Sequence, residues 1–320
     1  MHVSTQILHG DWFCCGCLAR ANSLGYAFIS ADYQLLLPST GHDILNDVRD
    51  VFKFIKENHF THRKTTFEID PEKIVVAGGS AGGHLAYLAA AHINPKPKGI
   101  LALYAMGGDY FVSFNFVYSN FYSKNGIQTS NWLHPKTKPF LSGRPLVDPT
   151  KFTKFLHPFP EGLPAPASDA PVTLDPKTGI PTEFRAPFSA VTLQLGLWID
   201  YYTGEFNPSL SGILRDALDA GSPPLSVGDL VPERHHPLFP TFVISSSWPP
   251  TFMLHGTADT AVAILSSQNM KTLLTNAGVS AELIEVEGKD HAFDVQPNAD
   301  VEFAGVYDKV KEFLKRCIEN

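Results

Sequence analysis

The pattern Gly-x-Ser-x-Gly occurs at residues 78–82, between the β-branched run Lys73–Ala77 and the small-residue segment His84–His92. This order predicts a strand, a sharp turn and a helix, with the serine hydroxyl standing above the edge of a sheet. The glycines leave room for backbone segments that a side chain would keep apart. A merely structural glycine turn is the alternative. We interpret Ser80 as a candidate nucleophile, which needs a base to accept its proton.

Two loops further along the chain supply a base and an acid. Asp259 follows a predicted strand at 251–254, and His291 follows another at 281–286. Because parallel strands end at one edge of a sheet, we expect both side chains to lie near Ser80. His291 would then take the proton of the serine, and Asp259 would hold the imidazole in the productive tautomer. The chain order serine, acid, histidine is the one that nucleophile-elbow hydrolases use.

Four other residues compete for these roles and are rated lower. Asp290 adjoins the candidate base, and immediate neighbours rarely align a carboxylate with an imidazole. Asp294 is a weaker alternative acid. His255, at a strand end before a glycine, is interpreted as bracing its loop, and His84 as a packing residue of the helix after the serine.

Strand and helix patterns alternate on both sides of a proline-rich stretch. The expected strands are 5–8, 27–31, 73–77, 99–104, 251–254 and 281–286, and the expected helices are 14–24, 43–58, 84–92, 263–277 and 300–317. The helix at 43–58 carries apolar residues at helical spacing. Such alternation predicts an α/β fold with a mainly parallel sheet covered by helices on both faces.

Twenty of the 25 prolines lie between Pro135 and Pro250. Each fixes φ and removes a backbone donor, so long regular elements are not expected in most of this stretch. We expect residues 107–248 to form a proline-rich cap inserted into a core made of 1–106 and 249–320. The first part of the cap is dense in aromatic residues, which could form an acyl-binding wall or the core of the cap itself: Phe111, Phe114, Phe116, Tyr118, Phe121, Tyr122 and Trp132.

Five segments together resemble the α/β-hydrolase superfamily, and within it the hormone-sensitive-lipase-like (fold-3) group of esterases and lipases. They are His9-Gly10 with Gly16, Asp32–Leu35, Gly78–Gly83, His255–Asp259 and Asp290–Phe293, and they span nearly the whole chain. The resemblance implies an α/β-hydrolase fold with a large cap. It also implies cleavage of carboxylic esters through an acyl-enzyme on Ser80, without metal or organic cofactor.

The loop expected to form the oxyanion hole departs from that group. The group usually reads His-Gly-Gly-Gly where this chain reads His9-Gly10-Asp11-Trp12. The expected donors are the backbone amides of Asp11, Trp12 and Ala81, and the carboxylate of Asp11 would oppose an oxyanion unless it points away. Losing one donor costs about 10²–10³ in turnover. The alternatives are a serine peptidase of related fold and a catalytically weak, hydrolase-like ligand-binding protein.

The group also usually has further sequence before the His-Gly strand, which here begins within a few residues of Met1. Either the sheet is smaller at that edge, or the chain is truncated.

Composition excludes several other classes. The chain has 320 residues, 44% of them hydrophobic, and a net charge of −7, so we expect no nucleic-acid partner. The resemblance implies a small-molecule ester as the substrate. Four cysteines make no disulfide framework. The cluster Cys14-Cys15-Gly16-Cys17 has no second ligand pair at zinc spacing, and we expect it to pack on the core. His235-His236, among prolines, is interpreted as a surface turn, and no nucleotide-binding glycine motif follows a strand.

No window holds eighteen consecutive apolar residues, and Met1–Gly10 lack the features of a signal peptide. We therefore expect a soluble, cytoplasmic protein. The oligomeric state is left open.

Overall fold

The computed structural model describes residues 2–5, 15–62, 65–108, 110, 133, 135, 148–163, 185–220 and 228–319. The chain divides into two units. The first comprises Met1–Tyr33, Leu45–Asp109 and Phe239–Asn320, and the second comprises Gln34–Ile44 and Tyr110–Leu238. The boundary of the expected cap, 107–248, remains a prediction.

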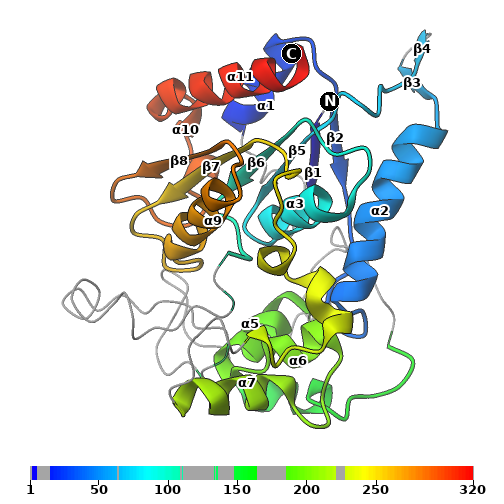
Figure 1. Cartoon of the computed structure of the whole chain (residues 1–320), viewed down its shortest axis with the longest axis vertical. Helices are drawn as coiled ribbons and strands as arrows, with labels where there is room; N and C mark the ends of the chain where they lie inside the picture. Colours follow the sequence, from blue (N-terminus) through cyan, green and yellow to red (C-terminus); the bar gives the residue numbers. More distant parts are fainter. Residues whose placement is uncertain are drawn as a thin grey trace. The chain divides into compact units, whose positions relative to one another are not determined.

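A parallel sheet of six strands forms the centre of the first unit (Figure 1). Every neighbouring pair in it is parallel. Across the sheet the strands are β2 (Phe28–Ala31), β1 (His2–Thr5), β5 (Val75–Gly79), β6 (Gly99–Leu103), β7 (Thr251–Gly256) and β8 (Ala281–Val286). The central strands β6 and β7 are buried along their whole length, as expected for strands covered on both faces.

Helices cover both faces of this sheet. In Figure 1, α1 (Cys15–Ser23) and α11 (Ala304–Glu319) lie on one side, and α3 (Ala81–His92) and α9 (Leu265–Asn276) on the other. The helix α2 (Gly41–Glu57) belongs to this unit from Leu45 onward. Apolar residues of α1, α11 and the strands form one buried cluster. The predicted alternation of strands and helices is thereby confirmed.

Three details of this unit differ from the sequence prediction. The expected strand 5–8 is observed as His2–Thr5, and residues 6–8 lie outside the described residues. The helix expected at 300–317 is two helices, α10 (Ala299–Glu302) and α11, because Phe303 leaves the helical path and packs between Phe293 and Tyr307. A short antiparallel hairpin, β3 (Phe60–His62) with β4 (Thr65–Phe67), was not expected.

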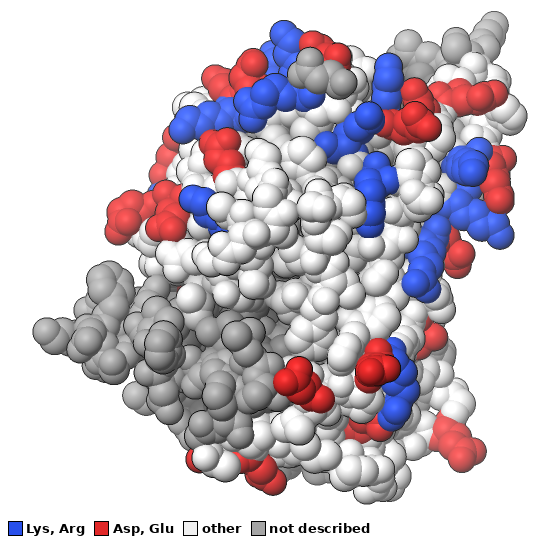
Figure 2. All heavy atoms as spheres, in the orientation of Figure 1, with Lys and Arg blue, Asp and Glu red and all other residues white. Residues whose placement is uncertain are grey.

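Charged side chains of both signs alternate on the surface of the first unit (Figure 2). Along α11 they include Asp308, which pairs with Arg20 of α1 at 3.0 Å. This pair joins two helices that already pack through apolar residues.

The second unit contains short helices. They are the 3₁₀ segments η1 (Pro149–Phe155) and η2 (Glu233–Leu238), and α5 (Arg185–Leu195), α6 (Trp198–Thr203) and α7 (Leu210–Asp219). Pro187 lies in the first turn of α5, where proline is tolerated, and α6 and α7 contain none. Among the described residues, α5, α6 and α7 thus lie where prolines are widely spaced, whereas η2 contains Pro237. The aromatic residues at 111–132 lie outside the described residues.

His235 corrects one sequence interpretation, because it is not part of a surface turn. Its side chain is 3% exposed, and it contacts Glu205 Oε1 and His42 Nε2 at 2.9 Å each. The contact with Glu205 holds the pKa of that carboxyl below its ordinary value, with a further contribution from Arg234. His235 is therefore a buried polar anchor of the second unit.

None of the described helices is both long enough and apolar enough to cross a membrane.

Candidate active site

Ser80 lies on a strained turn between β5 and α3. Its φ of 54° and ψ of −121° are unusual for a residue with a side chain and cost about 1–3 kcal/mol. Two backbone bonds hold the turn: the Ser80 amide donates to Leu103 O (2.9 Å), and the Met106 amide donates to Ser80 O (3.0 Å). A Cβ at Gly78 would lie 2.1 Å from the carbonyl oxygen of Gly82, so the turn closes only around glycine.

Ser80, Asp259 and His291 meet at the carboxyl edge of the sheet, all within the first unit. The distance from Ser80 Oγ to His291 Nε2 is 3.0 Å, and that from His291 Nδ1 to Asp259 Oδ2 is 2.8 Å. They follow β5, β7 and β8 respectively. The side chain of Asp259 is fully buried, whereas that of His291 is 22% exposed. A buried carboxylate thus faces one ring nitrogen and a hydroxyl faces the other.

The loop after β7 holds Asp259 in a charged state. Its Oδ1 accepts from the amides of Ala261 and Val262, both at 2.8 Å. Burial alone would raise the pKa of Asp259, but hydrogen bonds from His255 and His291 outweigh it and hold that pKa well below its ordinary range. The carboxylate therefore stays ionised near neutral pH.

The two competing carboxylates have other partners. Asp290 Oδ1 accepts from the amide and the hydroxyl of Thr260 (2.9 and 3.0 Å) and from the His291 amide (2.7 Å). Asp290 therefore ties the loop after β7 to the loop after β8. Asp294 Oδ1 accepts from the hydroxyl of Tyr104 at 2.7 Å.

His255 contacts the candidate acid directly, which sequence reasoning missed. Its Nε2 lies 2.8 Å from Val262 O and 3.2 Å from Asp259 Oδ2, and its Nδ1 lies 2.8 Å from Ser267 Oγ. Both neighbours of Nε2 are acceptors, so Nε2 carries a proton.

His84, four residues after Ser80, is buried in α3 at 3% exposure. Burial lowers the pKa of His84 to about 3, so the ring is neutral at physiological pH. This fits the expected packing role.

Of the three expected oxyanion-hole donors, Ala81 lies within the described part of the chain. Ala81 is the first residue of α3, so its amide has no acceptor within the helix and lies at the positive end of the helix dipole. Asp11 and Trp12 lie outside the described residues. Cys17 of the cysteine cluster is buried and is not part of a disulfide, and the described residues hold no group of three or more metal-binding side chains.

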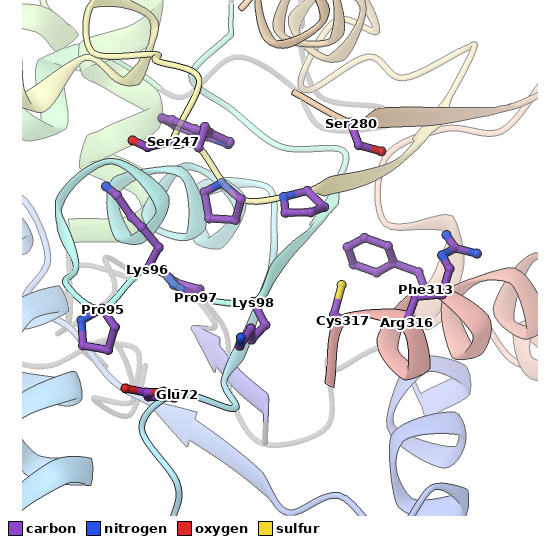
Figure 3. A pocket seen from close by; sticks show the side chains of 13 residues that line it. Glu72, Pro95, Lys96, Pro97, Lys98, Ser247, Ser280, Phe313, Arg316 and Cys317 are labelled. Atoms are coloured by element: carbon purple, nitrogen blue, oxygen red, sulfur yellow. The ribbon is translucent and has the colours of Figure 1, made fainter. Parts of the chain in front are cut away.

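A separate pocket of about 630 Å³ lies at the opposite edge of the sheet (Figure 3). Lys98, Pro250 and Ser280, each directly before a strand, contribute to its wall. Its other charged residues are Glu72, Lys96 and Arg316. The ammonium of Lys96 already caps α3, since it donates to the carbonyl oxygens of Ala90 and Ala91. Ser80, Asp259 and His291 do not line this pocket.

Sequence comparisons match one family model and several much longer proteins. The family described as BD-FAE matches residues 13–121, less than half of the chain. Non-reducing polyketide synthases of Preussia isomera and Penicillium brevicompactum are 26% and 23% identical over 93% and 92% of this chain. The chain spans only 12% and 13% of their lengths.

Among solved structures, a sugar hydrolase from Lactococcus lactis covers all of this chain, and 90% of its own length is aligned, with 17% identity and a TM-score of 0.50. An esterase from Pyrobaculum calidifontis is 17% identical over 98% of this chain and 75% of its own, with a TM-score of 0.49. The six parallel strands, the turn at Ser80 and the likeness to the first of these structures identify the architecture. The chain has the α/β-hydrolase fold.

Proposed function

We propose that the protein is a serine hydrolase that cleaves carboxylic esters. The observation that carries this proposal is the chain of two short contacts, 3.0 Å from Ser80 Oγ to His291 Nε2 and 2.8 Å from His291 Nδ1 to Asp259 Oδ2. A hydroxyl, an imidazole and an ionised carboxylate in this order are the groups that acyl transfer needs.

In the proposed reaction, Ser80 Oγ attacks the carbonyl carbon of the ester while His291 Nε2 takes the hydroxyl proton. The imidazolium is stabilised by the carboxylate of Asp259, which stays ionised because of its hydrogen bonds. His291 then gives the proton to the leaving alcohol. A water molecule, deprotonated by the same imidazole, then attacks the acyl-serine. The imidazolium returns this proton to Ser80 Oγ as the bond between Oγ and the acyl carbon breaks and the acid leaves.

The negative charge on the carbonyl oxygen would be stabilised by backbone amides. Ala81 is one proposed donor, because its amide begins α3. The amides of Asp11 and Trp12 are the other proposed donors. The substrate is a small molecule, and the chemistry requires neither metal nor organic cofactor.

Labelling with a fluorophosphonate probe tests this proposal. The wild-type protein and a Ser247→Ala variant, which removes an exposed serine at the opposite edge of the sheet, should react equally. The Ser80→Ala variant should not react. Equal labelling of Ser80→Ala and wild type would overturn the assignment of the nucleophile.

The polyketide synthase relatives favour a second candidate substrate, an acyl thioester. Polyketide chains are carried as thioesters, and the same three residues could transfer such an acyl group to water. Comparing kcat/KM for an alkyl ester and for a thioester of the same acyl group separates the two. An aminoacyl amide in the same panel tests the peptidase alternative. Tight binding without turnover across the panel would favour a ligand-binding protein.

A further inference from the structure

Tyr104 stands directly after β6, between the strand that leads to Ser80 and the strand that leads to Asp259. Its amide donates to Leu254 O of β7 at 2.6 Å, and the preceding residue, Leu103, accepts the amide of Ser80. The φ of Tyr104 is +39°, a conformation that is unfavourable for a bulky residue and persists only where the surroundings enforce it. The backbone thus holds this side chain at the candidate active site.

The ring of Tyr104 packs against the imidazole of His291. The two ring centroids are 4.7 Å apart, and the planes meet at 65°, an edge-to-face contact. On another side of the ring lies Gly79, where a Cβ would be 3.1 Å from the Tyr104 hydroxyl oxygen and Cε2. Because Gly79, directly before Ser80, has no side chain, the ring of Tyr104 has room to pack there.

The hydroxyl of Tyr104 is bonded to the loop that carries His291. It donates to Asp294 Oδ1 at 2.7 Å, and both residues are buried, at 6% and 2% exposure. Asp294 comes three residues after His291, and Ala292 between them has a left-handed φ of 55°. This hydrogen bond between two buried groups fixes the tight loop relative to β6.

We propose that Tyr104, through its bond to Asp294, is the positioning residue for His291. The bond anchors the loop, and the ring closes one side of the imidazole, so that Nε2 stays within hydrogen-bond distance of Ser80 Oγ. Tyr104 exchanges no proton with the substrate. The kinetic part of this inference rests on the proposed esterase function.

Three variants test the proposal: Tyr104→Phe, Asp294→Ala, which removes the acceptor, and the double variant. Tyr104→Phe keeps the ring and removes the hydroxyl. The control is Tyr87→Phe, because Tyr87 is a fully buried tyrosine of the same unit whose hydroxyl has no hydrogen-bond partner among the described residues. For each variant, kcat and KM for p-nitrophenyl acetate, the rate of fluorophosphonate labelling and the melting temperature are measured.

Each single variant should lower kcat and the labelling rate roughly tenfold, because a loosened base spends less time aligned with the serine, and KM should change little. The double variant should be no worse than either single one, since both remove the same bond. Tyr87→Phe should keep the wild-type rates. A lower melting temperature with wild-type kcat and labelling rate in Tyr104→Phe would show a merely structural bond and overturn the inference.

A readout that needs no turnover separates this inference from the proposed function. The proton on His291 Nδ1, bonded to Asp259, gives a downfield signal in the NMR spectrum. It should broaden or disappear in Tyr104→Phe and persist in Tyr87→Phe. If the wild type hydrolyses no ester and Ser80 takes no label, the proposed function fails. An unchanged signal in Tyr104→Phe would then overturn the positioning role on its own.

Discussion

Replacing His84 with glutamine should make the protein less sensitive to mild acid. The ring is buried in α3, and burial lowers its pKa from the ordinary 6.5 to about 3. As the pH falls below 6.5, the unfolded chain takes up a proton at this position and the folded chain does not. Acid therefore favours the unfolded state, and the stability present above pH 6.5 is lost as the pH falls toward 3.

The size of the effect follows from the same values. A pH of 5 lies about 1.5 units below the pKa of a histidine in the unfolded chain. At about 1.36 kcal/mol per unit, protonation of His84 therefore stabilises the unfolded chain by about 2 kcal/mol. Glutamine cannot titrate, so the variant should lose about 2 kcal/mol less stability than the wild type between pH 7.5 and pH 5. All other titrating groups are shared and cancel in the comparison.

Urea denaturation at the two pH values, followed by tryptophan fluorescence, measures this difference. The control is His59→Gln, because His59 is an exposed histidine of the same unit, with its side chain 66% exposed. The control should follow the wild type. If wild type and His84→Gln lose the same free energy between pH 7.5 and pH 5, the assignment of a neutral, buried His84 is wrong.

Two further predictions concern the site. Asp259→Asn should reduce kcat for an ester by about 10⁴ without loss of the fold, because an amide cannot stabilise the imidazolium or select its tautomer; steady-state rates and circular dichroism measure the two effects, and a loss below tenfold would refute the assigned acid. Gly78→Ala should abolish fluorophosphonate labelling and lower the melting temperature, because the new Cβ would meet the backbone at Gly82. Gly305→Ala, at a helical position with nothing within 4 Å, should leave both unchanged, and equal behaviour of the two glycine variants would contradict the close approach at the elbow.

The central strands and the turn at Ser80 could be predicted because their signals are local. A buried parallel strand is a short run of apolar residues, and the nucleophile turn needs glycines at fixed positions beside it. The three candidate residues, Ser80, Asp259 and His291, were proposed from the same kind of signal, since each lies just after a strand. Their mutual distances came only from the folded chain.

What could not be predicted depends on contacts between distant residues. His235 is surrounded by prolines in the sequence, yet it is buried by its contacts with Glu205 and His42. The break at Phe303 has no local signal, because the packing of its ring against Phe293 decides it. Tyr104 looked like the last residue of a strand, and its role depends on Asp294, 190 positions away.

The pairing of β6 with β7 places Leu101 beside Phe252, although most of the second unit is encoded between them. A ribosome therefore makes Ser80 long before it makes the residues proposed to activate it. Until β7 emerges, β6 presents an open strand edge to which another chain could bind. Closing so long a loop is also slow. We expect that a nascent chain must be protected from aggregation during this interval, and that hydrolytic activity begins only after synthesis has passed His291.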